Sequence, residues 1–366
     1  MDTDEENARY GFRAWRGAAG RLSIIVLAVA GTSIGFAYTG GWISPTRLSS
    51  VKLVDRFEDV GGRHEGFRRN HAKGICIAGF FDPSDRGAAL SSAQVFGGGR
   101  VPVVGRFSFA GGDPFVADSG GAVRAFALQF RMPDGEEWRT AMINLPVFPT
   151  NTPQAFYGLL AASRPLPGSD KPDPALMKAF LDQHPETVAA LARIKAEPPT
   201  LEFADSRFHG LNAFLFRQRG NSTPVRLSLL PVDPPATRPA SAPARDRNRL
   251  FDALAEDIQK GPLRWNLVAM IGKPEDPTRD PTKEWPADRM QILLGTVTVD
   301  RAVAEGPHTC RDLTFDPLVL PAGIEASDDP ILAARSGTYA ESLARRSGEP
   351  KHSSAVTAAE IEGAAR

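Results

Sequence analysis

The feature that most constrains this chain is a long stretch without formal charge near its N-terminus. No Asp, Glu, Lys or Arg occurs in residues 22–46, and residues 22–43 (LSIIVLAVAGTSIGFAYTGGWI) are predominantly apolar. At about 1.5 Å of rise per residue, a helix of this length can cross the hydrocarbon core of a bilayer. The sequence therefore predicts a transmembrane anchor at residues 22–43, preceded by a short tail at residues 1–21.

Three interpretations of this segment are open: an uncleaved anchor, a cleaved signal peptide and a buried helix. A basic start followed by an apolar stretch is common to the first two, but no clear cleavage site of small residues follows it. Tyr38 and Trp42 near its far end suit an interfacial aromatic belt. Arginines lie nearer to the segment than any acidic residue, which favours a cytoplasmic N-terminus. We expect a single-pass protein of the inner membrane whose main domain faces the periplasm or the exterior.

The composition of the remainder is that of an ordinary globular domain. Lys+Arg and Asp+Glu are both 43, so the net charge is zero and nucleic acid is not an expected partner. With 34 glycines and 31 prolines, many turns are expected. Cys76 and Cys310 are too few for a metal knuckle. They are either two buried thiols or one bridge, and the sequence does not decide between these.

Alternating apolar residues predict a mostly antiparallel sheet with interspersed helices. The expected strands are residues 74–81, 101–109, 122–130, 138–148, 208–216, 224–232, 264–271 and 290–299. Helices are expected at residues 51–62, 173–196 (interrupted at Pro185), 249–260 and 330–346. The Pro/Ala-rich residues 231–244 predict an extended surface connection. This order favours an α+β fold built on a barrel, at residues 44–346, followed by a flexible tail at residues 347–366.

One helical face in the last predicted helix carries an unusual set of side chains. Arg335, Tyr339 and Arg346 are spaced four and seven residues apart, so they share a face. Two guanidinium groups beside a tyrosine favour its phenolate, and a phenolate is a hard anionic ligand that suits Fe(III). Taken alone, this spacing favours an exposed polar stripe.

Six segments in the same order together resemble the catalase family. Residues 321–339 (PAGIEASDDPILAARSGTY) are similar to the proximal segment of catalases, and residues 71–74 (HAKG) to the distal histidine and its strand. The other four segments are residues 106–108 (RFS), 124–127 (RAFA), 282–286 (TKEWP) and 313–317 (LTFDP). The resemblance covers about residues 51–346 and implies an antiparallel β-barrel catalase core with surrounding helices that binds haem b, preceded here by one transmembrane helix.

The resemblance also implies a role for each matching residue. Tyr339 corresponds to the axial ligand of the haem iron, and Arg335 to the arginine that hydrogen-bonds its phenolate oxygen. His71 corresponds to the distal base that acts on peroxide, and Ser108 to the hydroxyl that orients its ring. The remaining matches are the propionate-binding arginines and the aromatic residues of the haem pocket: Arg68, Arg106, Arg346, Phe148 and Phe156.

One position departs from the catalase pattern. Catalases have an asparagine pair whose first member orients peroxide, whereas this chain has Ile143 followed by Asn144. Asn144 matches the second member and is kept as a catalytic candidate. The change predicts weak or no catalase activity, and a peroxidase that reduces hydrogen peroxide or organic peroxides with a small organic reductant.

Other functions of the same fold stay open. An isomerase of fatty-acid hydroperoxides, a true minimal catalase and a haem carrier are the alternatives. Compared with the family, we expect a protein without most of the N-terminal arm, without a further C-terminal domain and without an NADPH-binding stretch. We therefore expect the protein to be related to the short catalase-related peroxidases, with an open haem edge and a monomeric or homodimeric state.

Overall fold

The computed structural model describes residues 3–39, 43, 47–118, 123–166, 168–169, 171–235, 247–356 and 361–362. The chain divides into two units, Met1–Lys52 and Leu53–Arg366. The first contains helix α1 (Thr3–Thr39), in which Gly20–Tyr38 has a mean hydropathy of 1.6 and no buried part. A membrane span and a signal sequence share these properties, so the helix is consistent with an anchor and with a signal peptide. Trp42, expected at the membrane interface, lies outside the described residues.

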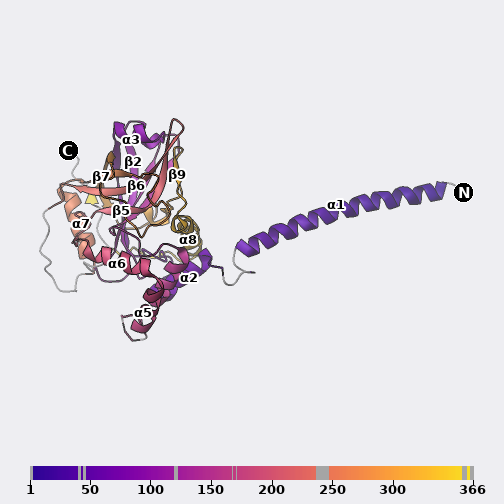
Figure 1. Ribbon diagram of the computed structural model, residues 1–366, viewed down its shortest axis with the longest axis horizontal. Helices are drawn as coiled ribbons and strands as arrows, with labels where there is room; N and C mark the ends of the chain where they lie inside the picture. The colour runs from indigo at the N-terminus through magenta and orange to yellow at the C-terminus, as the bar shows by residue number, and fades with distance from the viewer. Residues whose placement is uncertain are drawn as a thin grey trace. The chain divides into compact units, whose positions relative to one another are not determined.

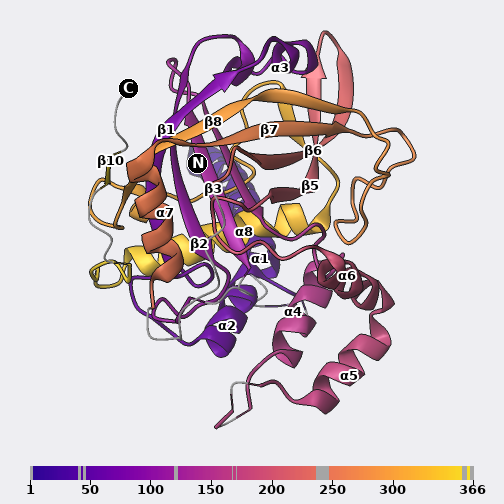
Figure 2. The ribbon, with the colours of Figure 1, turned by 90° about the vertical axis from the view of Figure 1, so that its left-hand side faces the viewer.

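The second unit is built on a closed antiparallel barrel. Strands β1 to β8 pair in chain order, and β1 also pairs with β8, which closes the barrel (Figure 2). The strands are β1 (Gly74–Pro83), β2 (Val101–Phe109), β3 (Arg124–Arg131), β4 (Glu137–Ile143), β5 (Phe208–Gln218), β6 (Asn221–Val232), β7 (Leu263–Ile271) and β8 (Gln291–Val303). Two short strands are added at the edges, β9 (Ile324–Ala326) on β5 and β10 (Ile361–Glu362) on β8. The predicted α+β barrel is confirmed.

The barrel wall has a seam between β4 and β5. These two strands are paired only at Ile143 and His209, whereas every other consecutive pair within β1 to β8 is bonded along a longer stretch. The register of β5 also shifts between His209 and Ala213, and Leu211 within this bulge has a φ of 60°. A bulge re-aims side chains and ends regular pairing, so this part of the wall is free to line a site.

The inside of the barrel is filled by large apolar side chains. Phe107 of β2 stacks on Phe126 of β3, with ring centroids 4.1 Å apart, and Trp138 and Trp265 are fully buried in the same core. Because successive residues of a strand point to opposite faces, the neighbours of these core residues point outward. The outer face of β2, β3 and β4 is therefore available for other contacts.

Helices surround the barrel. They are α2 (Ser50–Gly61), α3 (Asp85–Leu90), α4 (Pro153–Ala162), α5 (Pro174–Gln183), α6 (Pro185–Ala196), α7 (Arg249–Lys260) and α8 (Pro330–Ser347), with two 3-10 turns, η1 (Gln94–Phe96) and η2 (Cys310–Asp312). Helices α5 and α6 lie at one end of the barrel and α3 at the other (Figures 1 and 2). Asp329 caps α8 by accepting a hydrogen bond from the backbone N–H of Ile331, and Pro330 occupies the first turn.

Most predicted elements have their counterparts, and the main differences concern the end of β4, the short unpredicted elements such as α3 and α4, and the C-terminal tail. Strand β4 ends at Ile143 rather than at residue 148, and α4 was not predicted. The predicted tail begins with ordered contacts, because Glu349 pairs with buried Arg69 and Val356 is fully buried. The part of the Pro/Ala-rich connection at residues 236–244, and most of residues 357–366, lie outside the described residues.

Candidate active site

A cavity of about 210 Å³ lies between the outer face of the barrel wall and helices α2, α4 and α8. Strand alternation explains its walls: Phe107 points into the barrel core, whereas Arg106 and Ser108 on either side line the cavity. Ile143 and the bulge of β5 line it at the seam. All but one of the predicted site residues border this cavity: Arg68, His71, Arg106, Ser108, Phe148, Phe156, Arg335, Tyr339 and Arg346.

Asn144 is the exception among the predicted site residues. Its side-chain oxygen accepts a hydrogen bond from the backbone N–H of Arg124 at 2.8 Å, and it does not line the cavity. Ile143, the preceding residue and the last of β4, lines the cavity instead. Asn144 therefore fastens the end of β4 to β3, and its position does not support a catalytic role.

His71 is held by a tight turn at the start of β1. Its φ is 57°, and the side-chain oxygen of Asn70 accepts from the backbone N–H groups of His71 (3.0 Å) and Gly111 (2.8 Å). Ser108 Oγ lies 3.4 Å from His71 Nδ1, a long contact for a hydrogen bond. Burial first, and then the nearby Arg106, Arg335 and Arg68, lower the pKa of His71 to about 3. The imidazole is therefore neutral near pH 7 and able to accept a proton.

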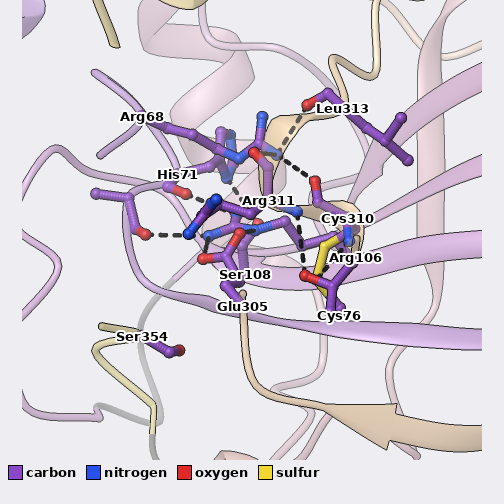
Figure 3. A network of polar contacts seen from close by, with 12 residues as sticks. Arg68, His71, Cys76, Arg106, Ser108, Glu305, Cys310, Arg311, Leu313 and Ser354 are labelled. Carbon is purple, nitrogen blue, oxygen red and sulfur yellow. Dashed lines mark hydrogen bonds and ion pairs between the residues drawn. A yellow bond between two sulfur atoms is a disulfide. The ribbon is translucent and has the colours of Figure 1, made fainter. Parts of the chain in front are cut away.

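Arg106 is held in place by four hydrogen bonds to the protein. Its Nε and Nη2 donate to the two carboxylate oxygens of Glu305, both at 2.9 Å, and its Nη1 and Nη2 donate to the carbonyls of His71 and Ala72 (Figure 3). Its guanidinium lies over Gly74, where an added Cβ would be 2.4 Å from Arg106 Cζ. The glycine of the HAKG segment is thus needed to make room for this arginine, and Glu305 is a partner that sequence reasoning missed.

Arg68 and Arg346 approach the same region from other elements. Arg68 Nη2 donates to the carbonyls of Cys310 and Leu313 at 3.0 and 2.9 Å, and also to that of Arg311. Arg346, at the end of α8, donates to the carbonyls of Arg311 and Leu313. Burial lowers the pKa of Arg346 to about 10, so it still carries its charge at neutral pH. Three guanidinium groups therefore converge at one end of the cavity.

A disulfide supports this arginine cluster. Cys76 of β1 and Cys310 of η2 are bonded, with Cα atoms 5.4 Å apart, which decides a question that the sequence left open. The bond attaches η2, whose carbonyls accept from the arginines, directly to the barrel (Figure 3). Together with Ala127 and Phe315, the two sulfur-bearing side chains form a small buried cluster against which Tyr339 packs.

A second polar network lies on the side of Tyr339. Arg335, one turn before Tyr339 on α8, donates to Asn212 Oδ1 at 2.6 Å and to the carbonyl of Ala141 at 2.9 Å. Asn212 Nδ2 in turn donates to Asp329 Oδ2 at 2.7 Å. Burial raises the pKa of Asp329, although the amide of Asn212 and the helix N–H groups oppose this.

This network differs from the prediction for Arg335. Its Nη atoms are engaged by Asn212 and Ala141, and the guanidinium carbon lies 6.0 Å from the centroid of the Tyr339 ring. Asn212 comes from the bulge of β5, and sequence reasoning missed it because only the folded strand brings it to α8. Asp329 did have a signal, since an Asp directly before Pro marks a helix start.

The cavity has the properties that a haem requires. Its lining is mainly apolar, three guanidinium groups lie at one end, and the phenol of Tyr339 borders it. Arg68 Nε is buried without a hydrogen-bond partner, and such a donor is costly unless a ligand satisfies it. A flat apolar group with two carboxylates and a metal that accepts a phenolate would satisfy these groups, so the residues fit a tyrosine-ligated haem.

Fold and site together define a closed antiparallel barrel with a mainly apolar cavity between its outer wall and a tyrosine-bearing helix. The family model described as Catalase matches residues 38–362. The chain belongs to the catalase family.

Comparisons with individual proteins agree with this assignment. The chain is 36% identical over 336 residues to a catalase-related peroxidase of Synechococcus elongatus, covering 91% of this chain and 97% of that protein. It is 32% identical to a catalase-related peroxidase of Mycolicibacterium paratuberculosis, covering 82% and 96%. A fungal catalase structure superposes with a TM-score of 0.68 at 20% identity, which shows the shared fold, and the match spans 78% of this chain and 60% of that one.

Proposed function

We propose that the protein is a haem peroxidase that reduces hydrogen peroxide or organic peroxides with a small organic electron donor. The observation that carries this proposal is that Tyr339, neutral His71 and the arginine cluster border one cavity. The similarity to two catalase-related peroxidases along nearly their whole length supports the same activity. Tyr339 would hold haem b through its phenolate, and the bound haem would supply the redox chemistry of peroxide reduction.

The side chains of the cavity handle the peroxide and its protons. His71 Nδ1 faces Ser108, which leaves Nε2 to accept a proton from one peroxide oxygen and to return it to the other, so that water can leave. Arg68, Arg106 and Arg346 would hold the two propionates, because guanidinium groups bind carboxylates in a fixed planar geometry. Phe148 and Phe156, whose rings are 5.1 Å apart, exclude water from the cavity wall.

Ile143 favours peroxidase over catalase turnover. Its branched apolar side chain borders the cavity and can neither donate nor accept a hydrogen bond. Oxidation of a second peroxide molecule requires that this molecule be held and polarised by a hydrogen-bonding group. Oxidation of an organic donor does not require such a group at the position of Ile143. The expected result is strong oxidation of an organic donor and little oxygen evolution from hydrogen peroxide alone.

We also propose that the second unit faces the periplasm or the exterior, with α1 as an inner-membrane anchor. The apolar segment Gly20–Tyr38 is long enough to span a bilayer. The buried Cys76–Cys310 disulfide supports an oxidising compartment, because such bonds are rare in the cytosol. Protease accessibility in spheroplasts tests the orientation, and light scattering tests the expected monomer or homodimer.

Spectroscopy of the haem-loaded protein tests the proposed function. The wild type should take up one haem and show a high-spin ferric spectrum of the tyrosinate-ligated type, and Tyr339→Phe should lose this spectrum. Tyr157→Phe is the matched control, because Tyr157 accepts from Arg56 outside the cavity and should leave the spectrum unchanged. A wild type that takes up no haem, or a spectrum indifferent to Tyr339, would overturn the proposal.

A further inference from the structure

Glu305 is a buried carboxylate for which neither the fold nor the proposed chemistry gives a role. It follows β8, its side chain is 9% exposed, and both of its oxygens are engaged by Arg106. It does not border the large cavity. It lines a smaller adjoining one that shares Arg68 and Arg346 as walls. Glu305 therefore lies against Arg106 and outside the lining of the large cavity (Figure 3).

The cluster has a defined net charge. The guanidinium groups of Arg68, Arg106 and Arg346 contribute three positive charges and Glu305 one negative charge, which leaves +2. Of the charged groups around these four, Arg311 and Asp312 form an ion pair with each other, Lys351 lies 4.0 Å from Asp312 on the outer side, and His71 is neutral. Burial alone would raise the pKa of Glu305, but Arg106, Arg68 and Arg346 outweigh it and lower the pKa, so the carboxylate is ionised at neutral pH.

The hydrogen bonds show which N–H donors of Arg106 are occupied by Glu305 and which stay available to a ligand. It takes Nε and one hydrogen of Nη2 from Arg106, and the carbonyls of Ala72 and His71 take two more. One hydrogen of Nη1 is left for a ligand. Arg68, by contrast, keeps its Nε without a partner. Glu305 thus holds the plane of Arg106 while leaving the cluster able to bind a further anion.

We propose that Glu305 is the internal counter-ion of the propionate site: it positions Arg106 and sets the cluster to +2, the complement of a tetrapyrrole with both propionates ionised. This inference rests on the proposed haem function and assigns a ligand class to it, dianionic rather than esterified tetrapyrroles. Glu305 is a positioning residue, since it acts through Arg106.

The proposal predicts an effect that depends on the cofactor. Glu305→Gln keeps the size of the side chain and changes the net charge of the cluster from +2 to +3 in the apoprotein, and from zero to +1 with haem bound. Because electrostatic repulsion within a cluster grows with the square of its net charge, the apoprotein should lose several times more stability than the haem-bound protein. A residue with a purely structural role would destabilise both forms equally.

The test compares thermal unfolding of the full chain with and without haem. Losing one partner of a buried ion pair should lower the Tm of apo Glu305→Gln by roughly 5–10 °C, with less than half of that shift in the haem-bound form. Glu305→Asp, which keeps the charge, should restore most of the apo stability. Asp276→Asn is the matched control: Asp276 makes the same two-bond pair with buried Arg289 away from the cavity, and should destabilise both forms alike.

Titration with an ester separates the possible failures. Haem dimethyl ester should bind the wild type at least tenfold more weakly than haem, and Glu305→Gln should bind haem with unchanged or higher affinity. Equal Tm shifts of the apo and haem-bound forms of Glu305→Gln would overturn the counter-ion role, even where the wild type binds haem. If the wild type takes up no haem at all, the proposed function fails, and this inference fails with it.

Discussion

Replacement of Asn212 by alanine should loosen the tyrosine-bearing helix and remove one hydrogen-bond partner from each of Arg335 and Asp329. Asn212 is 1% exposed and connects Arg335 to Asp329 through hydrogen bonds of 2.6 and 2.7 Å. Both bonds involve a charged group, and alanine can form neither. Arg335 would keep only the carbonyl of Ala141, and Asp329 only its helix N–H groups.

The size of the effect follows from these contacts. A hydrogen bond to a charged group contributes about 1.5–3 kcal/mol, and Asn212 makes two such bonds. We expect Asn212→Ala to lower the free energy of unfolding by about 3–5 kcal/mol and the Tm by roughly 6–12 °C. In the haem-loaded protein, the charge-transfer bands should also shift, because Arg335 is one turn from Tyr339 and would be less firmly placed.

Urea unfolding followed by far-UV circular dichroism measures the first effect, and the absorption spectrum the second. Asn266→Ala is the matched control, since Asn266 accepts one neutral hydrogen bond from Thr296 on β8 and should cost no more than about 1.5 kcal/mol. A loss below about 1 kcal/mol for Asn212→Ala, or the same loss as for the control, would refute the view that this network holds α8 in place.

Three further predictions concern the cavity and its support. The pKa of His71 is about 3 in the folded protein against an ordinary 6.5, so as the pH falls the unfolded chain binds a proton before the folded chain does. The contribution of His71 to the free energy of unfolding is therefore complete above pH 6.5, and about 3 kcal/mol of it is lost between pH 7 and 4. Urea unfolding measured at each pH should show this loss in the wild type and not in His71→Phe. The Cys76–Cys310 bridge joins residues 234 positions apart in the chain. Replacing both cysteines by serine should lower the free energy of unfolding by up to about 5 kcal/mol. Unfolding of the wild type that does not change when dithiothreitol is added would contradict this prediction. Ile143→Asn should raise oxygen evolution from hydrogen peroxide at least tenfold over the wild type in an oxygen-electrode assay, and no gain would show that another part of the cavity limits catalase turnover.

The sequence predicted elements well where a local pattern decides the structure. Strand β2 and helix α7 have the predicted bounds, and the expected break at Pro185 separates α5 from α6. Prediction of α4 failed although its start carried a signal, since Thr152 caps it and Pro153 occupies its first turn. Strand β4 was predicted too long because apolar alternation continues past Ile143, where the chain has already left the barrel.

The same distinction between local and long-range information applies to the residues of the site. Residues that belong to a recognisable segment, such as His71 and Tyr339, could be placed from the sequence. Glu305 and Asn212 could not, because their partners are far away in the chain and only barrel closure and the bulge of β5 bring them together. Asn144 was misplaced for the opposite reason: its segment was recognised, but a single step along a strand reverses the direction of the side chain.

The order in which the cavity walls appear along the chain has a consequence for biosynthesis. The walls begin at Leu53 on α2 and are completed only by Arg346 near the end of α8. A ribosome must therefore release nearly the whole catalytic unit before tyrosine, histidine and arginines can surround a ligand together. A haem could therefore be enclosed by the complete set of side chains only after nearly all of this unit has left the ribosome.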